Sequence, residues 1–248
     1  MSPRLALVTG GIGGLGTEIC RYLARSGHRV IAADLGSRAE RVEQFMIDVA
    51  DLGESVHFEA LDVSDHAASG SALADIEARH GPISVLVNAA GITRDTSLRK
   101  MSEQQWSDVI TVNLGGVFNT CRALIDGMVE RGYGRIVNIS SVNGQTGQFG
   151  QTNYSAAKAG MHGFTMALAR EVAKKGVTVN SVSPGYCETA LVMAVPEAVR
   201  NQIVASIPVG RLGKPSEIAR VVDFLCAEDA GYITGANIPV NGGYFMDF

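Results

Sequence analysis

Short apolar runs alternate with amphipathic stretches along almost the whole chain. The apolar runs are rich in valine, isoleucine and alanine. They predict strands at residues 5–9, 29–33, 56–61, 84–89, 134–140, 177–183 and 237–241. Helical patterns lie between them, such as residues 16–27, where Gly27 is a candidate C-cap, and the long segment 102–131. This alternation predicts an α/β protein with a doubly wound parallel sheet of about seven strands and helices on both faces.

Length and composition fit one globular domain. The chain has 248 residues, of which 46% are hydrophobic and 19% charged, enough for one α/β core and short for two. No repeat, linker or low-complexity segment divides it, so residues 1–248 are expected to form a single domain. The net charge of −4 and the lack of a basic tract argue against a nucleic-acid partner.

Cysteine usage and hydropathy indicate the compartment. The spacing of the four cysteines matches no metal motif, so we expect free thiols and no bound metal. These residues are Cys20, Cys121, Cys187 and Cys226. The first apolar run is too short for a signal-peptide core, and no run approaches the length of a membrane span. We therefore expect a cytoplasmic protein with no membrane partner.

A glycine-rich turn joins the first predicted strand to the first helix. The stretch "TGGIGGLG" spans residues 9–16. Glycines permit a tight turn and let backbone N–H groups approach a pyrophosphate, which the helix N-terminus also favours. A turn that needs glycine only for its conformation is the structural alternative. The strand–helix context favours a dinucleotide site of the Rossmann type. The loop residues assigned to the cofactor are Gly10, Ile12, Gly13, Gly14, Leu15 and Gly16.

An acidic residue ends the second predicted strand. Asp34 follows Gly10 by 24 residues (34 − 10), close to the spacing of a carboxylate that reads the adenosine ribose. Such a carboxylate accepts hydrogen bonds from both ribose hydroxyls and repels a 2′-phosphate. It therefore favours NAD(H) over NADP(H). Arg38 and Arg41 follow, and either one is placed to contact a phosphate, so NADP(H) use stays open. An aspartate that only opens a turn is the structural alternative.

Tyr154 and Lys158 stand one helical turn apart after the polar loop "NISSVNGQTGQFGQTN". On one helix face, the charge of Lys158 is expected to favour the phenolate and lower the pKa of Tyr154. Tyr154 then exchanges a proton with a substrate oxygen while hydride moves to or from the neighbouring carbon. Lys158 also holds the nicotinamide ribose, and Ser140 or Ser141 orients the oxygen. An ordinary helical pair is the alternative for the Tyr–Lys spacing alone.

Together these motifs resemble the short-chain dehydrogenase/reductase family over essentially the whole chain. Further markers are "NAAG" at 88–91, "VNLGG" at 112–116, "YSAAK" at 154–158 and "SPG" at 183–185. The resemblance implies an NAD(P)H-dependent oxidoreductase, and the family's serine spacing selects Ser141 over Ser140. The implied catalytic residues are Asn113, Ser141, Tyr154 and Lys158. The implied further cofactor contacts are Asp62, Val63, Asn88, Ala89, Gly91, Tyr154, Lys158, Pro184, Gly185 and Thr189. A non-catalytic dinucleotide-binding regulator on the same fold is disfavoured, because the serine, tyrosine and lysine are all present.

The loop "NGQTGQFGQTNY" resembles acetoacetyl-CoA reductases of polyhydroxyalkanoate (polyhydroxybutyrate) synthesis more than 3-oxoacyl-(acyl-carrier-protein) reductases. This implies reduction of acetoacetyl-CoA to (R)-3-hydroxybutanoyl-CoA. The carrier-protein reductase and another short-chain alcohol dehydrogenase stay as alternatives. Asp34 departs from the first group, whose members resemble NADPH enzymes. The implied substrate contacts are Asp95, Lys100, Ser141, Gln148, Phe149, Gln151 and Tyr186.

Physical chemistry is compatible with these substrate contacts. Glutamine amides donate hydrogen bonds to a thioester oxygen, and Phe149 and Tyr186 pack on a short acyl chain. A basic cluster in one loop is able to meet CoA phosphates. Its members are Arg94, Arg99 and Lys100. Hydrogen bonding within the loop and an ordinary solvated loop are the structural alternatives.

Two further segments are apolar. Residues 189–208 read as a pair of short helices that form a lid over the site, with core or subunit packing as the alternative. The C-terminal stretch "IPVNGGYFMDF" carries Tyr244, Phe245 and Phe248, which are costly to expose to water. By the family resemblance, this stretch predicts a subunit contact in a homotetramer.

Overall fold

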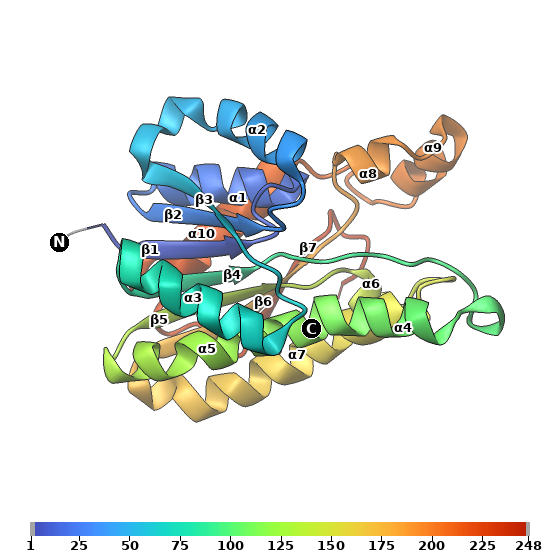
Figure 1. Cartoon of the computed structure of the whole chain (residues 1–248). Coiled ribbons are helices and arrows are strands. Elements are labelled where there is room, and N and C mark those ends of the chain that lie inside the picture. The colour runs from blue at the N-terminus through green and yellow to red at the C-terminus, as the bar shows by residue number, and fades with distance from the viewer. Residues whose placement is uncertain (1–2, 247–248) are drawn as a thin grey trace.

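A seven-stranded parallel sheet forms the centre of the protein (Figure 1). The structure is a computed structural model that describes residues 3–246; Phe248 lies outside them. The strands are β1 Leu5–Thr9, β2 Arg29–Asp34, β3 Val56–Ala60, β4 Ile83–Asn88, β5 Gly134–Ile139, β6 Val177–Pro184 and β7 Asn237–Val240. Their order in the sheet is β3-β2-β1-β4-β5-β6-β7. The predicted doubly wound parallel sheet is confirmed, and no predicted strand end is off by more than one residue.

Helices cover both faces of the sheet, with α1 and α10 on one face and α3, α5 and α7 on the other (Figure 1). The helices are α1 Gly14–Arg25, α2 Ala39–Asp48, α3 His66–His80, α4 Glu103–Ile110, α5 Gly116–Glu130, α6 Asn143–Thr146, α7 Thr152–Val172, α8 Ala190–Met193, α9 Glu197–Ala205 and α10 Pro215–Cys226. Alternate residues of each buried strand serve different layers. In β1, Val8 belongs to the core under α1 and α10, and Leu7 belongs to the core under α5 and α7. Burial on both faces explains why residues 5–8 of β1 form an unbroken apolar run.

The first helix, α1, ends next to Gly27, the residue that the sequence suggested as its C-cap. Gly27 has a φ of +92°, which favours glycine. Its N–H donates to the Ala24 carbonyl, and the N–H of His28 donates to the Leu23 carbonyl. This pair of bonds is a Schellman motif. It satisfies the last carbonyls of α1 and turns the chain directly into β2.

The long segment 102–131 is helical throughout but contains a π turn. Helix α4 starts with a capping box between Ser102 and Gln105. Residues Thr111–Gly115 then form the π turn, and α5 follows without a break. Such turns are rare and frequently lie at functional sites. This one contains the fully buried Asn113.

Helices α8 and α9 occupy most of the segment that the sequence assigned to a lid (Figure 1). They lie at the carboxyl-terminal side of the sheet, and their role as a lid stays a prediction. No helix among residues 3–246 is both long and apolar enough to cross a membrane.

Candidate active site

A cleft opens where the strand order reverses. The chain proceeds from β1 to β2 and β3 on one side, and then returns to β4 on the other side of β1. The loops after β1 and β4 therefore diverge, which is where doubly wound sheets bind ligands. The cleft has a volume of about 310 Å³. Its walls include seven residues that the sequence assigned to the cofactor: Gly10, Gly13, Asp34, Asp62, Val63, Ala89 and Gly91.

The glycine loop is tight enough to require its glycines. Gly10 has a φ of +65°, and its carbonyl accepts the N–H of Gly13 at 3.0 Å. A Cβ on Gly16 would lie only 2.1 Å from the Gly10 oxygen. Ile12 is fully buried in the core, so its backbone and not its side chain is available to a ligand. Thr189 reaches the same loop from the far end of the chain, with its Cβ 3.8 Å from the position of a Cβ on Gly14.

Asp34 lies at the carboxyl end of β2, as predicted, but it has a partner. Its Oδ1 accepts the N–H of Leu35 at 2.8 Å and an Nη1–H of Arg38 at 3.1 Å. Arg38 is half exposed and lines the cleft. Arg41 is held elsewhere, because its Nε donates to the Ile12 carbonyl at 2.7 Å. Of the two arginines considered for phosphate binding, Arg38 is therefore the one in the cleft.

Asn88 lies beneath the cleft rather than in its wall. Its Nδ2 donates to the Oδ1 of Asn138 at 2.9 Å, and its Oδ1 accepts the Thr120 hydroxyl at 2.7 Å. Only its backbone is therefore free to meet a cofactor. Sequence reasoning missed Thr9, whose Oγ1 accepts the backbone N–H groups of Ala89 and Ala90 at 3.2 Å. Its position at the end of β1, directly before the glycines, was the available signal.

The structure brings the four predicted catalytic residues together. The Ser141 hydroxyl is close enough to the Tyr154 hydroxyl to lower the pKa of the tyrosine. The Nζ of Lys158 donates to the Ile139 carbonyl at 2.7 Å and lies 5.6 Å from the centre of the Tyr154 ring. The side-chain amide of Asn113 binds the backbone of Ile92 twice: its Oδ1 accepts the N–H at 2.8 Å and its Nδ2 donates to the carbonyl at 3.0 Å.

Gly91 lets this group approach the cleft. A Cβ at Gly91 would lie 3.4 Å from the Oδ1 of Asn113 and 3.6 Å from the Nζ of Lys158. The missing side chain thus keeps the space in front of the lysine open. Pro184 and Gly185 lie at the end of β6 beside the loop after β5, where the Pro184 carbonyl accepts the N–H of Val142 at 2.8 Å. A Cβ on Gly185 would lie 2.8 Å from the Asn241 backbone.

Burial sets the ionisation of the tyrosine–lysine pair. The expectation that Lys158 lowers the pKa of Tyr154 is wrong for the protein without cofactor. Burial raises the pKa of Tyr154, the hydrogen bond with Ser141 opposes that rise, and the charge of Asp95 adds to it. Burial also lowers the pKa of Lys158 from its usual 10.5 to about 8. The neutral tyrosine therefore holds its proton ready for donation.

The buried lysine predicts a pH-dependent stability. Its folded pKa of about 8 lies below its unfolded value of 10.5. Between these values the unfolded chain binds a proton that the folded chain has lost, so stability rises with pH. We compare the free energy of unfolding of wild type with that of Lys158→Met, which lacks the titrating group. We expect the difference, wild type minus variant, to increase by about 2 kcal/mol between about pH 7 and about pH 9.5. Urea denaturation of both proteins without cofactor measures this gain, and a constant difference across that range would contradict it.

The predicted substrate loop is partly occupied by its own hydrogen bonds. The Oε1 of Gln151 accepts from Asn143 at 2.9 Å, and its Nε2 donates to Asp95 at 2.8 Å. Gln151 therefore links the loop after β5 to the loop after β4. Gln148 is exposed, and Phe149 is 90% exposed. These two side chains are thus free to meet a ligand.

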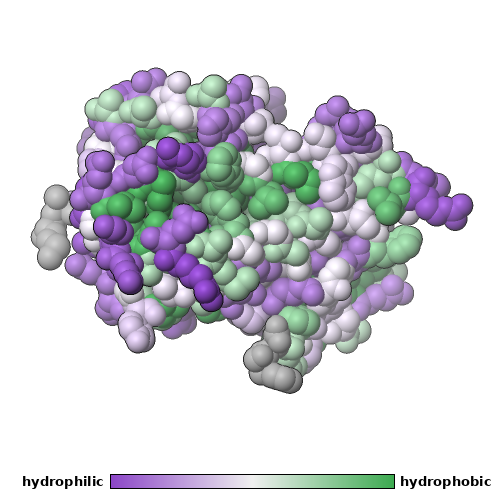
Figure 2. Space-filling model, turned by 90° about the horizontal axis from the view of Figure 1, so that it is seen from below, coloured by the Kyte–Doolittle hydropathy of each residue, from purple (hydrophilic) through white to green (hydrophobic). Residues whose placement is uncertain are grey.

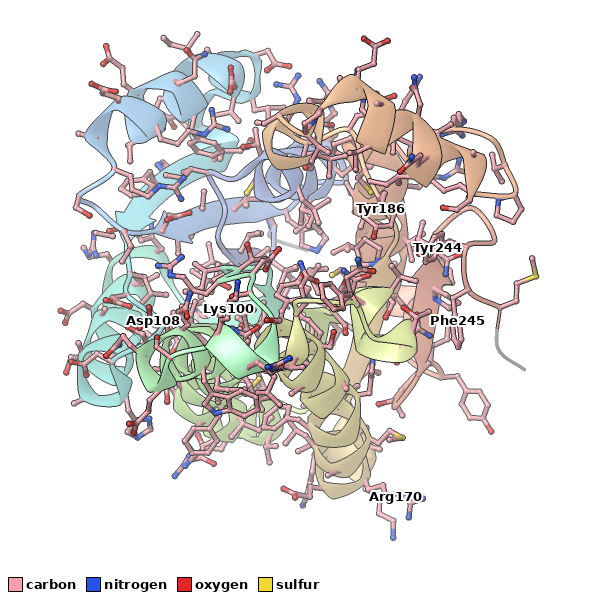
Figure 3. All side chains as sticks on the ribbon, turned by 90° about the vertical axis from the view of Figure 1, so that its right-hand side faces the viewer. Lys100, Asp108, Arg170, Tyr186, Tyr244 and Phe245 are labelled. Atoms are coloured by element: carbon pink, nitrogen blue, oxygen red, sulfur yellow. The ribbon has the colours of Figure 1, made fainter. Side chains whose placement is uncertain are left out.

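Tyr186 and Lys100 lie on opposite sides of the site (Figure 3). The Tyr186 ring meets the Tyr244 ring edge-on, with 5.6 Å between their centres. Lys100 is exposed at the end of a 3₁₀ turn, Leu98–Lys100. Asp108 pairs with Arg94 at 3.5 Å, so the predicted basic cluster is partly neutralised.

The fold, the glycine loop and the serine–tyrosine–lysine group define a dinucleotide-binding oxidoreductase. A sequence model described as short chain dehydrogenase matches residues 4–200. The chain belongs to this family, whose members use nicotinamide cofactors. It is 55% identical to an acetoacetyl-CoA reductase of Allochromatium vinosum, covering 98% of this chain and 99% of that protein. It is 52% identical to an acetoacetyl-CoA reductase of Cupriavidus necator over 99% of this chain and all of that one. A 3-oxoacyl-(acyl-carrier-protein) reductase of Pseudomonas aeruginosa is 43% identical over 99% of both chains.

Proposed function

We propose that this chain is an acetoacetyl-CoA reductase that prefers NADH and forms (R)-3-hydroxybutanoyl-CoA. The observation that carries the proposal is the gathering of Ser141, Tyr154 and buried Lys158 beside Gly91, which lines the dinucleotide cleft. The choice of thioester is supported by similarity, since relatives named acetoacetyl-CoA reductase reach 55% identity and the named carrier-protein reductase 43%.

The cleft fits a nicotinamide dinucleotide. The first intrahelical bond of α1 runs from the Thr17 N–H to the Gly13 carbonyl, so the N–H groups of the preceding first turn, residues 14–16, are available to a pyrophosphate. Asp34 at the far end of the cleft suits a ribose diol, and Gly91 leaves room beside Lys158. When bound, the cofactor supplies the hydride.

The chain's own residues then manage the substrate oxygen. The Ser141 hydroxyl donates a hydrogen bond to the 3-oxo oxygen and orients it. Tyr154 gives its proton to the same oxygen as the alkoxide develops. Lys158 holds the nicotinamide ribose and, when charged, stabilises the phenolate that remains. Asn113 fixes the segment at Ile92 that borders the site, and we assign it the water of the proton relay that the family resemblance implies.

The thioester is assigned to the loop after β5. Gln148 and Phe149 are its free side chains, and Gln151 holds Asp95 in place between the two loops. We expect Gln148→Ala to lower kcat/KM for acetoacetyl-CoA by about tenfold, which corresponds to one lost hydrogen bond. The KM for NADH stays at the wild-type value. Steady-state kinetics with each substrate varied measures both quantities.

Gln44→Ala is the matched control for Gln148→Ala. Gln44 lies on α2 and bonds to Asp48, away from the loop after β5. We expect it to keep the wild-type kcat/KM. If Gln148→Ala and Gln44→Ala behave alike, the substrate assignment of the loop is rejected.

The choice between CoA and carrier protein is tested by one comparison. The kcat/KM for acetoacetyl-CoA is measured against that for the acetoacetyl thioester of an acyl carrier protein, with NADH at saturation. The proposal expects the CoA thioester to be the better substrate. A preference for the carrier-protein thioester would establish the alternative, and activity only with simple ketones would reject both.

Assembly as a homotetramer in the cytoplasm completes the proposal. Apolar surface gathers where α5 and α7 face the viewer in Figure 2. Phe118 on α5 is 49% exposed, and Met166 on α7 is 53% exposed. Apolar helix faces of this kind suit contact with a second copy of the chain. Light scattering during gel filtration tests the assembly, and a monomer would contradict it. The cysteines are buried free thiols, which suits a reducing compartment.

A further inference from the structure

A chain of hydrogen bonds runs behind the catalytic group, and its central member is His162. This residue lies on α7, one turn beyond Lys158. Its Nε2 is 3.2 Å from the Ser140 hydroxyl on one side, and its Nδ1 is 3.1 Å from the Ser181 hydroxyl on the other. The imidazole therefore joins the end of β5 to β6. His162 is not part of the catalytic and cofactor motifs named in the sequence analysis.

The direction of these bonds follows from counting protons. The Ser140 hydroxyl lies 2.8 Å from the Lys158 carbonyl, which only accepts, so the single Ser140 proton points there. The Nε2 of His162 must then donate to Ser140. A neutral ring with a proton on Nε2 accepts at Nδ1, where Ser181 gives its proton. The Ser181 hydroxyl also lies 3.1 Å from the Oδ1 of Asn237, but that oxygen already accepts the Ser183 hydroxyl at 2.8 Å, so we assign the single Ser181 proton to Nδ1. A neutral imidazole thus satisfies both ring nitrogens.

These hydrogen bonds lead from His162 to the backbone beside the catalytic residues. Ser140 directly precedes Ser141, and its N–H donates to the Val182 carbonyl at 2.7 Å. Lys158 meets the same strand end twice, since its carbonyl accepts from Ser140 and its Nζ donates to Ile139. The spacing between Ser141 on the loop and the lysine on α7 therefore depends on the Ser140 hydroxyl. That hydroxyl is oriented by the N–H it accepts from His162.

We propose that His162 is a positioning residue, which as the neutral Nε2–H tautomer holds Ser140 on the Lys158 carbonyl and so fixes the distance between Ser141 and the tyrosine–lysine pair. The kinetic part of this inference rests on the proposed function. Around the imidazole, β5, β6 and β7 present Ser140, Ser181 and Asn237, and α7 adds the charge of Lys158. Burial and that charge both lower the pKa of His162, which agrees with a neutral ring.

Three variants separate positioning from general stability. His162→Leu removes the donor to Ser140, and we expect kcat to fall roughly tenfold. His162→Gln keeps an amide N–H within reach of Ser140, and we expect it to restore kcat to within about threefold of wild type. His28→Leu is the control, because His28 is a partly buried histidine that bonds to the Leu23 carbonyl in the loop between α1 and β2. It is expected to lose stability but not kcat.

The tautomer is measured without substrate. A long-range nitrogen–proton NMR spectrum of the full-length protein, labelled at histidine, should show His162 neutral and protonated at Nε2 near pH 7. A ring protonated at Nδ1 alone or at both nitrogens would overturn the inference. So would wild-type kcat in His162→Leu, or equal losses in the Gln and Leu variants. If wild type fails to reduce acetoacetyl-CoA, the proposed function fails, while the spectrum still decides the inference.

Discussion

Replacing Tyr154 with phenylalanine is expected to lower kcat by about 10²–10⁴-fold while the Kd for NADH stays near the wild-type value. The ring fills the same space, so the cleft and the Lys158 contact persist. The lost hydroxyl is the group that carries a transferable proton, and burial raises the pKa of Tyr154, so that proton stays on the tyrosine at neutral pH. Stopped-flow and steady-state kinetics with acetoacetyl-CoA give kcat, and a fluorescence titration gives the Kd.

Tyr133→Phe is the matched control for this change. The Tyr133 hydroxyl is buried without a hydrogen-bond partner in the described part of the chain, and its ring packs against Arg4 and Arg135. Removing it is expected to leave kcat unchanged. The proton-donor assignment is rejected if Tyr154→Phe retains near-wild-type kcat, or if Tyr133→Phe loses as much.

The second large effect is expected in cofactor choice. Asp34 offers two carboxylate oxygens to a ribose diol and repels a 2′-phosphate. Losing a charge-assisted hydrogen bond costs about 1.5–3 kcal/mol, so we expect kcat/KM to favour NADH by about one to two orders of magnitude. Arg38 already pairs with Asp34 at 3.1 Å and is half exposed, so it can turn to a phosphate and leave some NADPH activity.

Asp34→Ser is expected to move the preference toward NADPH, because it removes the carboxylate and frees Arg38. Arg38→Ala should act in the opposite sense and lower the remaining NADPH activity. Arg41→Ala should lower activity with both cofactors alike, since Arg41 binds the glycine loop at Ile12. The ratio of kcat/KM values for the two cofactors decides the matter. An unchanged ratio in Asp34→Ser, or a wild type that favours NADPH, would contradict the assignment.

The sheet could be predicted closely because its signal is local. Each central strand is buried on both faces, so an apolar run such as residues 5–8 marks it directly. The glycine loop could be predicted for the same reason, since the close contact between Gly10 and Gly16 joins residues of one short loop. The π turn at Asn113 was not, because a helical pattern cannot show one extra residue in a turn that is stabilised by contacts with Ile92.

The parts of the site that escaped prediction depend on contacts between distant segments. Gln151 binds Asp95 across 56 positions, and no sequence pattern reveals that its amide is already used. The pKa of Tyr154 was misjudged for the same reason, because spacing gives the neighbouring charge but not the desolvation. His162 was overlooked because Ser140 and Ser181 reach it from two different strands.

One assay tests the central claim most directly. Purified wild-type protein is mixed with NADH and acetoacetyl-CoA, the loss of reduced nicotinamide is followed by absorbance, and the thioester product is identified by mass spectrometry and chiral analysis. The account predicts that each NADH consumed yields one (R)-3-hydroxybutanoyl-CoA. No consumption of NADH or NADPH with this substrate, or a different product, would contradict it.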